Sequence, residues 1–137
     1  MVDLWPEHIE QTEITAPAFI LKEQASLLGR KTQMIVKAEV EPGDPSHHEG
    51  MRYFDKEDYR KFIYDFYIVG PLLDNYRYLL FGIMYNIDLY PVEFILEPEI
   101  EEDVVGENVH LLIAKSESEF IKMLGLILKS KKTIKVR

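Results

Sequence analysis

The sequence predicts an α+β domain, an antiparallel sheet of four to six strands with helices at about residues 15–29 and 117–130 packed on it. All but three of the aromatic residues fall between Tyr53 and Phe94, in apolar runs separated by short polar or Pro-containing breaks. Such runs are typical of strands. Helical spacing of apolar residues precedes and follows this segment. Neither an internal repeat nor a change of composition divides the chain, so one domain, 1–137, is expected.

The first expected element is the helix at about residues 15–29. Thr15 is a suitable N-cap, and Pro17 lies in the first turn, where its missing N–H costs no hydrogen bond. Gly29 supplies a C-terminal stop. A mostly apolar face, predicted to lie on the sheet, is formed by residues that recur at helical spacing: Phe19, Ile20, Gln24, Leu27 and Leu28.

Five strands are expected after this helix. Alternation of apolar and polar residues predicts a half-buried strand at 33–41. Three aromatic runs at 61–69, 76–85 and 89–97 predict consecutive strands. Because the middle run is apolar on both faces, it is expected at the centre of the sheet. A short strand is expected at 109–114.

The last predicted helix spans residues 117–130. Ser116 and Glu119 form the S-x-x-E pattern of a capping box, and a wide apolar face ends in lysines that suit the negative end of the helix dipole. The residues that follow, 133–136, are expected to form a final strand or a tail.

A long loop is expected at residues 42–58, because this segment is polar and rich in Pro and Gly. Loops of this length are usually functional or mobile. The loop contains His47, His48 and Glu49, the nearest approach to a metal cluster in the sequence. Adjacent histidines point in different directions, and neither a Cys partner nor i, i+4 spacing accompanies them, so no metal site is predicted.

Composition and motifs exclude several classes of function. The chain has no cysteine, so disulfides and thiol catalysis are excluded, and its net charge of −8 argues against a nucleic-acid partner. No apolar stretch approaches the ~20 residues that span a bilayer, so no membrane partner is expected. The acidic first residues do not resemble a secretory signal, which predicts a cytoplasmic location. No glycine-rich phosphate loop is present, and no cofactor is expected.

The charged residues are unevenly distributed. Residues 97–107 carry acids without a base, in a segment expected to link two strands, and residues 129–137 carry bases without an acid. Such runs are usually solvated surface, and mutual attraction within the fold is the alternative.

The aromatic strands supply the candidate binding residues. Tyrosine offers a large contact area with a polar tip, so tyrosines on a concave sheet face are suited to a flat or apolar ligand. The alternative is that they fill the core and its rim. Asp65 lies in an aromatic strand, where a hydrophobic surface can raise the pKa of a carboxylate. The alternative is an outward residue paired with a base on the next strand, such as Arg77. The candidate residues are Tyr64, Asp65, Tyr67, Tyr76, Arg77 and Tyr78.

Three classes of function remain. A small protein-binding or regulatory accessory domain, such as an immunity-type protein, is favoured by the acidity, the aromatic residues and the lack of catalytic residues, and its partner would be another protein or a second copy of the chain. A small-molecule binding domain with an aromatic-lined pocket is the second class. An enzyme with an unrecognised Asp, Glu, His or Tyr site is the third. A flat apolar patch favours the first class, an enclosed cavity the second, and convergent titratable groups the third.

Overall fold

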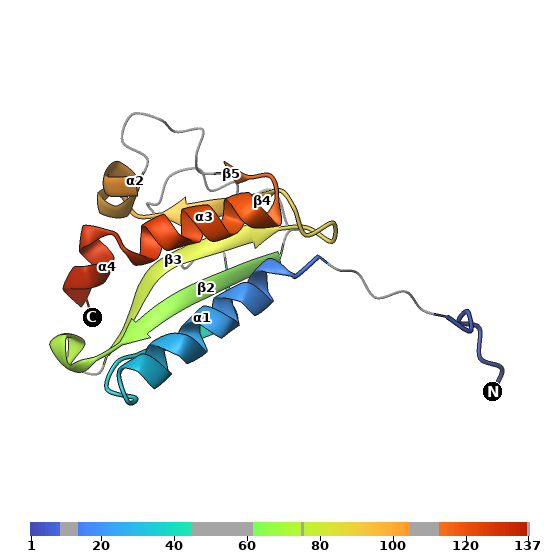
Figure 1. The fold of residues 1–137 in the computed structure, drawn as a ribbon, viewed down its shortest axis with the longest axis horizontal. Coiled ribbons are helices and arrows are strands. Elements are labelled where there is room, and N and C mark those ends of the chain that lie inside the picture. Colours follow the sequence, from blue (N-terminus) through green and yellow to red (C-terminus); the bar gives the residue numbers. More distant parts are fainter. Residues whose placement is uncertain (9–13, 45–61, 75, 105–112, 137) are drawn as a thin grey trace.

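Five strands form one antiparallel sheet in the computed structural model, which describes residues 1–8, 14–44, 62–74, 76–104 and 113–136. In sheet order, the strands are β1 (Lys37–Pro42), β2 (Phe62–Val69), β3 (Arg77–Tyr85), β4 (Val92–Leu96) and β5 (Ile113–Ala114). The helices are α1 (Pro17–Lys31), α2 (Pro98–Val104), α3 (Glu117–Leu128) and α4 (Lys131–Val136), with a short 3₁₀ helix η2 (Pro71–Leu73). The predicted α+β class, with helices packed on an antiparallel sheet, is confirmed (Figure 1).

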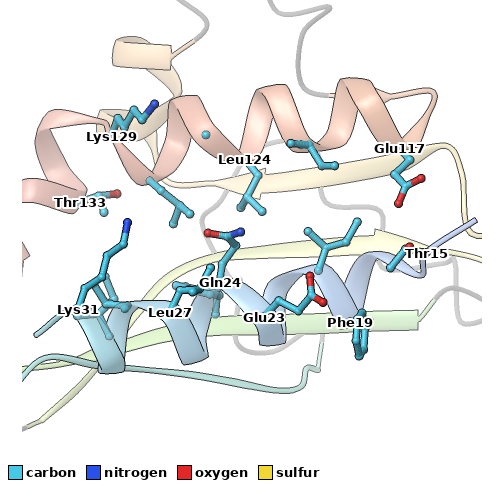
Figure 2. Close-up of a pocket in the computed structure, with 17 residues that line it drawn as sticks. Thr15, Phe19, Glu23, Gln24, Leu27, Lys31, Glu117, Leu124, Lys129 and Thr133 are labelled. Atoms are coloured by element: carbon cyan, nitrogen blue, oxygen red, sulfur yellow. The ribbon is translucent and has the colours of Figure 1, made fainter. Parts of the chain in front are cut away.

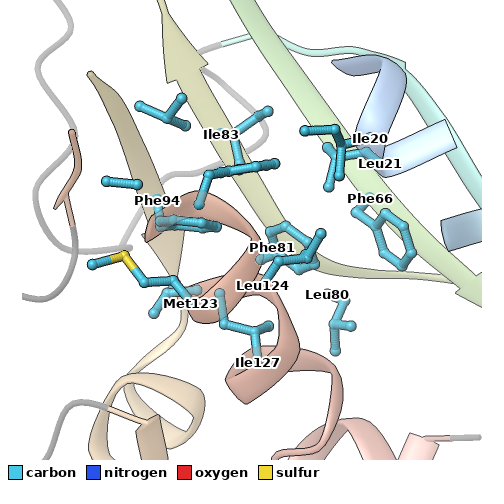
Figure 3. Close-up of a cluster of buried hydrophobic side chains, with 14 of the residues drawn as sticks. Ile20, Leu21, Phe66, Leu80, Phe81, Ile83, Phe94, Met123, Leu124 and Ile127 are labelled. Atoms are coloured by element: carbon cyan, nitrogen blue, oxygen red, sulfur yellow. The ribbon is translucent and has the colours of Figure 1, made fainter. Parts of the chain in front are cut away.

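Helices α1 and α3 lie on the same face of the sheet and run in the same direction (Figure 1). The core lies between this pair of helices and the strands. Leu21 of α1 and Leu124 of α3 are buried in one cluster with Phe66, Phe81 and Phe94 from three adjacent strands (Figure 3). Both helices therefore pack on the sheet, as expected, but Phe19, Leu27 and Ile121 of the predicted apolar faces remain exposed.

Stacked phenylalanine rings connect the central strands to α3. The ring centres of Phe66 and Phe81 are 5.1 Å apart, and those of Phe94 and Phe120 are 5.3 Å apart. Stacked aromatic pairs have separations of about 4.5–7 Å and contribute beyond the area that they bury. The aromatic belt of the sequence is therefore in large part the core of the sheet.

Strand β3 is central, as predicted, but it contains a bulge. Phe66 of β2 lies opposite Phe81, whereas the next residue, Tyr67, lies opposite Leu79. Leu80 is therefore an extra residue on β3. Because of this residue, the predicted alternation holds on each side of the bulge but changes phase across it.

The start of α1 differs from the prediction by one residue. Ala16, and not Thr15, occupies the N-cap position, and it offers no side-chain hydrogen bond. Thr15 has a different role, because its carbonyl accepts a hydrogen bond of 3.1 Å from Tyr90 Oη. The prediction that Pro17 lies in the first turn is confirmed.

The end of α1 lies beyond the predicted stop. Gly29 is buried inside the helix, and the C-cap is Thr32, whose hydroxyl donates to the carbonyl of Leu28 at 2.9 Å. Gln33 and Met34 then adopt left-handed backbone conformations, with φ of 53° and 67°. The strand predicted from residue 33 is therefore shorter, because these residues turn the chain before β1.

The predicted capping box of α3 is confirmed. Ser116 Oγ accepts a hydrogen bond of 3.3 Å from the Glu119 N–H. The Glu119 carboxylate in turn accepts one of 2.6 Å from the Lys115 N–H. These bonds satisfy N–H groups that have no partner inside the helix.

Two short helices, α2 and α4, replace the predicted acidic linker and the predicted final strand or tail. The N–H of Lys131 donates to Asp103 Oδ2 at 2.8 Å, which joins α4 to α2. Thr133 Oγ1 donates to the Ile127 carbonyl at 2.7 Å. One contact distant in sequence and one nearby thus stabilise these helices, and local propensity is too weak a signal to reveal the distant one.

Several sequence predictions fall on residues outside the described ranges. The predicted loop at 42–58 is described only as far as Asp44, so His47, His48 and Glu49 are not placed. Of the strand predicted at 109–114, only β5 is described.

We expect that replacing Gly43 by alanine will destabilise the fold. A Cβ at this position would lie 2.6 Å from Oδ1 of Asp65, whose side chain is fully buried. Overpacking of this kind costs about 1–3 kcal/mol of unfolding free energy, measured by urea denaturation. The matched control is Gly125→Ala in α3, where a Cβ would meet no atom within 4 Å. Equal stability of Gly43→Ala and the unmodified protein would contradict this packing.

Candidate functional site

An open groove runs between α1 and α3 on the helix-covered face of the sheet (Figure 2). Its volume is about 530 Å³, within the usual ~300–1,000 Å³ of ligand sites. Phe66 and Ile68 of β2 line it, together with side chains of both helices. This apolar groove is the concavity that we assign as the candidate site.

Each wall of the groove is a row of residues spaced four apart. Residues at this spacing lie on one face of a helix and form a ridge along it. The α1 row consists of Phe19, Glu23, Leu27 and Lys31. The α3 row consists of Glu117, Ile121, Gly125 and Lys129.

Apolar side chains of these rows are exposed to solvent. Phe19 is 54% exposed, Leu27 is 38% exposed and Ile121 is 53% exposed. Single exposed apolar residues are common, but a set that lines one groove on both walls indicates an interaction site.

The two ends of the groove carry opposite charges. Glu117 lies beside Thr15 at the end where both helices begin, with Glu23 in the same half (Figure 2). Lys31 and Lys129 lie at the other end (Figure 2). Among the described residues, these four rim charges form no salt bridge with one another or with any other side chain. The groove is therefore polarised along its length.

The six candidate residues of the aromatic strands lie apart from this groove, and none of them lines it. Tyr64 stacks on Tyr85 with ring centres 6.0 Å apart. Tyr76 precedes β3 and is 75% exposed. Asp65 is fully buried, so the interpretation of this carboxylate as an outward residue was wrong. Asp65, Tyr67, Arg77 and Tyr78 belong to two separate polar clusters, so the six residues do not form one site in this structure.

The first polar cluster surrounds Arg77. Its Nε lies 2.9 Å from Glu39 Oε2 and its Nη2 lies 2.5 Å from Glu41 Oε2, both on β1. Its guanidinium carbon lies 4.0 Å from the centre of the Tyr67 ring, and the pKa of Tyr67 is raised by burial and by the nearby Asp65 carboxylate. Arg77 thus bridges β3 and β1 across β2. Because these side chains are about half exposed, each ion pair contributes only about 0–1 kcal/mol.

The second polar cluster joins the acidic and basic blocks of the sequence. Tyr78 Oη donates to the Glu97 carboxylate, with 2.9 Å to each oxygen, and burial followed by this carboxylate raises the pKa of Tyr78. Lys132 Nζ lies 3.8 Å from Glu97 and 3.4 Å from Glu99, and 5.4 Å from the centre of the Tyr78 ring. The two charge blocks therefore attract one another within the fold, which confirms the alternative to purely solvated surface. The raised pKa keeps the Tyr78 phenol protonated, so it acts as a donor and not as a base.

The groove was missed in the sequence because its walls lie on helices that also contribute to the core. The predicted apolar face of the first helix included Phe19, Leu27 and Leu28 together. Such a face is wider than the stripe that one helix buries on a sheet, and this excess width was the available signal. Gly125 in the middle of an apolar helix was a second signal.

No group of three or more His, Cys, Asp or Glu side chains in the described ranges is arranged to hold a metal ion. None of the helices described has the length and apolar character needed to cross a membrane. Comparison of the chain with models of protein families, with curated proteins and with solved structures gave no significant match.

Proposed function

We propose that this protein is a protein-binding accessory module that receives an apolar segment of a partner protein in the groove between α1 and α3. The observation that carries this proposal is the set of exposed apolar side chains on both walls. Leu27 and Ile121 line the groove from its two walls above an apolar floor, and Phe19 lies at its rim with its ring directed away from α3 (Figure 2). Covering these side chains removes apolar surface from water, which drives most protein association.

The open form of the groove favours a protein partner over a small ligand. Binding pockets for small ligands enclose about 70–90% of the ligand surface, whereas wall residues such as Phe19 remain half exposed in this groove. The groove also follows most of α1, whose 15 residues span about 22 Å. A segment of polypeptide is suited to both the length and the openness.

The test is photo-cross-linking in cells that naturally produce the protein. A photoreactive phenylalanine analogue at Phe19 is expected to capture a discrete partner, whereas the analogue at Leu72 in η2, which is 73% exposed, is not. The captured protein is then purified and recombined with the module. Ile121→Arg is expected to abolish this complex and to leave the melting temperature unchanged, because the side chain is exposed.

Leu126→Arg is the matched control for this experiment. Leu126 lies on the same helix, is 45% exposed and does not line the groove. Its variant is expected to bind the partner normally. A reconstituted complex that tolerates Ile121→Arg would refute the groove as the binding site, and so would equal cross-linking from Phe19 and Leu72.

A small-molecule ligand is the second candidate. Lys31 and Lys129 at one end of an apolar groove are suited to the carboxylate of an amphipathic acid (Figure 2). Native mass spectrometry of the purified protein separates the two candidates. A bound acid that is lost on Lys31→Gln would support this candidate against the protein partner.

A further inference from the structure

No contact among the described residues of the fold explains why residue 125 is a glycine. Glycine in the interior of a helix is less stable than alanine. A Cβ at Gly125 would meet no atom within 4 Å, whereas one at Gly43 would collide with Asp65. The packing of this chain therefore does not require glycine in the middle of α3. Glycine is also used where another backbone or a ligand approaches closely.

Gly125 lies on the wall of the groove. It is the third residue of the α3 row, between Ile121 and Lys129, and it lines the groove. The row is therefore a ridge with a gap, and the gap opens into the groove. Helices pack by placing the side chains of one into the spaces between the ridges of the other.

We infer that the occupant of the groove is an amphipathic α-helix of the partner protein, which lies antiparallel to α1 and α3 and contacts Gly125 closely. The inference rests on the proposed function and specifies its partner. Apolar residues of such a helix at i, i+4 and i+7 would contact the apolar side chains that line the groove, such as Leu27 and Ile121, and one of them would enter the gap at Gly125.

The charges of the groove support the antiparallel orientation. Helices commonly carry acids in the first turn and bases in the last turn, which complement the helix dipole. In the antiparallel orientation, the acids of the occupant lie near Lys31 and Lys129, and its bases lie near Glu23 and Glu117 (Figure 2). Its dipole also opposes those of α1 and α3. In the parallel orientation, each of these interactions would be repulsive.

The first test uses designed peptides of about 15 residues, the length of α1. The probe peptide has leucines at i, i+4 and i+7 on a helix-forming background, with glutamates in its first turn and lysines in its last. One control has the two charged turns exchanged, and another has a central proline that breaks the helix. By fluorescence anisotropy, the probe is expected to bind at least about tenfold more tightly than either control.

The second test uses variants of the protein. Gly125→Ala is expected to raise the melting temperature by about 2–6 °C and to weaken binding of the probe peptide at least about tenfold. Gly125→Leu is expected to abolish binding. Leu126→Ala, on the same helix outside the groove, is expected to bind the peptide normally. A merely structural glycine would not combine a gain in stability with a loss of binding.

The other outcomes overturn the inference in different ways. Equal binding of the proline-containing peptide would exclude a helical occupant, and equal binding of the exchanged peptide would exclude the orientation. Self-association that Gly125→Leu abolishes would make a second copy of the chain the occupant. Failure of every peptide would also reject the inference. Cross-linking from Phe19 decides the proposed function separately, so the proposal and the inference can fail independently.

Discussion

Leu124→Asp is expected to unfold the protein or to make it aggregate. Leu124 is 3% exposed and lies in the core between α3 and the sheet (Figure 3). An unpaired carboxylate buried at this position costs several kcal/mol, against a total stability of about 5–15 kcal/mol for a typical domain. Circular dichroism and thermal denaturation of the soluble fraction are the measurements.

Leu126→Asp is the control for Leu124→Asp, because Leu126 is exposed on the same helix. It is expected to melt within a few degrees of the unmodified protein. If Leu124→Asp remains soluble and has the same melting temperature as the unmodified protein, α3 does not belong to the core. Leu28→Asp is expected to have a smaller effect, since Leu28 is only partly buried and lines the groove.

The sequence predicted the sheet well because its signals are local. The aromatic runs are long, their breaks are clear, and the strand that is apolar on both faces lies at the centre of the sheet. The capping box of α3 was also predictable, because Ser116 and Glu119 satisfy N–H groups within one helical turn. Signals of this kind need no knowledge of distant residues.

Features that depend on distant contacts could not be predicted in this way. The bulge at Leu80 follows from the register of β3 against β2, which alternation within one strand does not contain. Helices α2 and α4 depend on the contact of Asp103 with Lys131, 28 positions apart in the chain. The stop predicted at Gly29 was wrong because Thr32 provides a hydroxyl that caps the helix later.

The candidate site illustrates the same limit. Neighbouring residues of an aromatic strand point to opposite faces, so Arg77 contacts β1 while Tyr78 contacts Glu97 at the end of β4. The groove, by contrast, is formed by Ile121 and Phe19, which are about a hundred positions apart in the chain. Only the packing of two helices on one sheet brings such residues together. That the six residues chosen from the aromatic strands form a binding surface stays a prediction.

Alkaline conditions are expected to destabilise the fold through Tyr85 and Tyr90. Burial is the main cause that raises the pKa of each phenol from 10.0 to about 12, with further contributions from Tyr64 for Tyr85 and from the Glu117 carboxylate for Tyr90. Below pH 10 both tyrosines are protonated whether the chain is folded or unfolded. Between pH 10 and about 12 they ionise mainly in the unfolded chain, so unfolding releases protons and stability falls as the pH rises.

The expected loss of unfolding free energy is about 3–5 kcal/mol for the two tyrosines together, since a shift of one pKa unit corresponds to ~1.4 kcal/mol for each group. Unfolding free energies from urea denaturation at about pH 9 and about pH 11.5 measure it. Tyr85→Phe combined with Tyr90→Phe is expected to flatten this dependence, although Tyr90→Phe also removes the hydrogen bond to Thr15 at the start of α1. The double variant should therefore be less stable than the unmodified protein at pH 9. Its unfolding free energy should then fall less as the pH rises. An equal loss of stability in both proteins would show that other groups, such as the lysines, cause the alkaline unfolding.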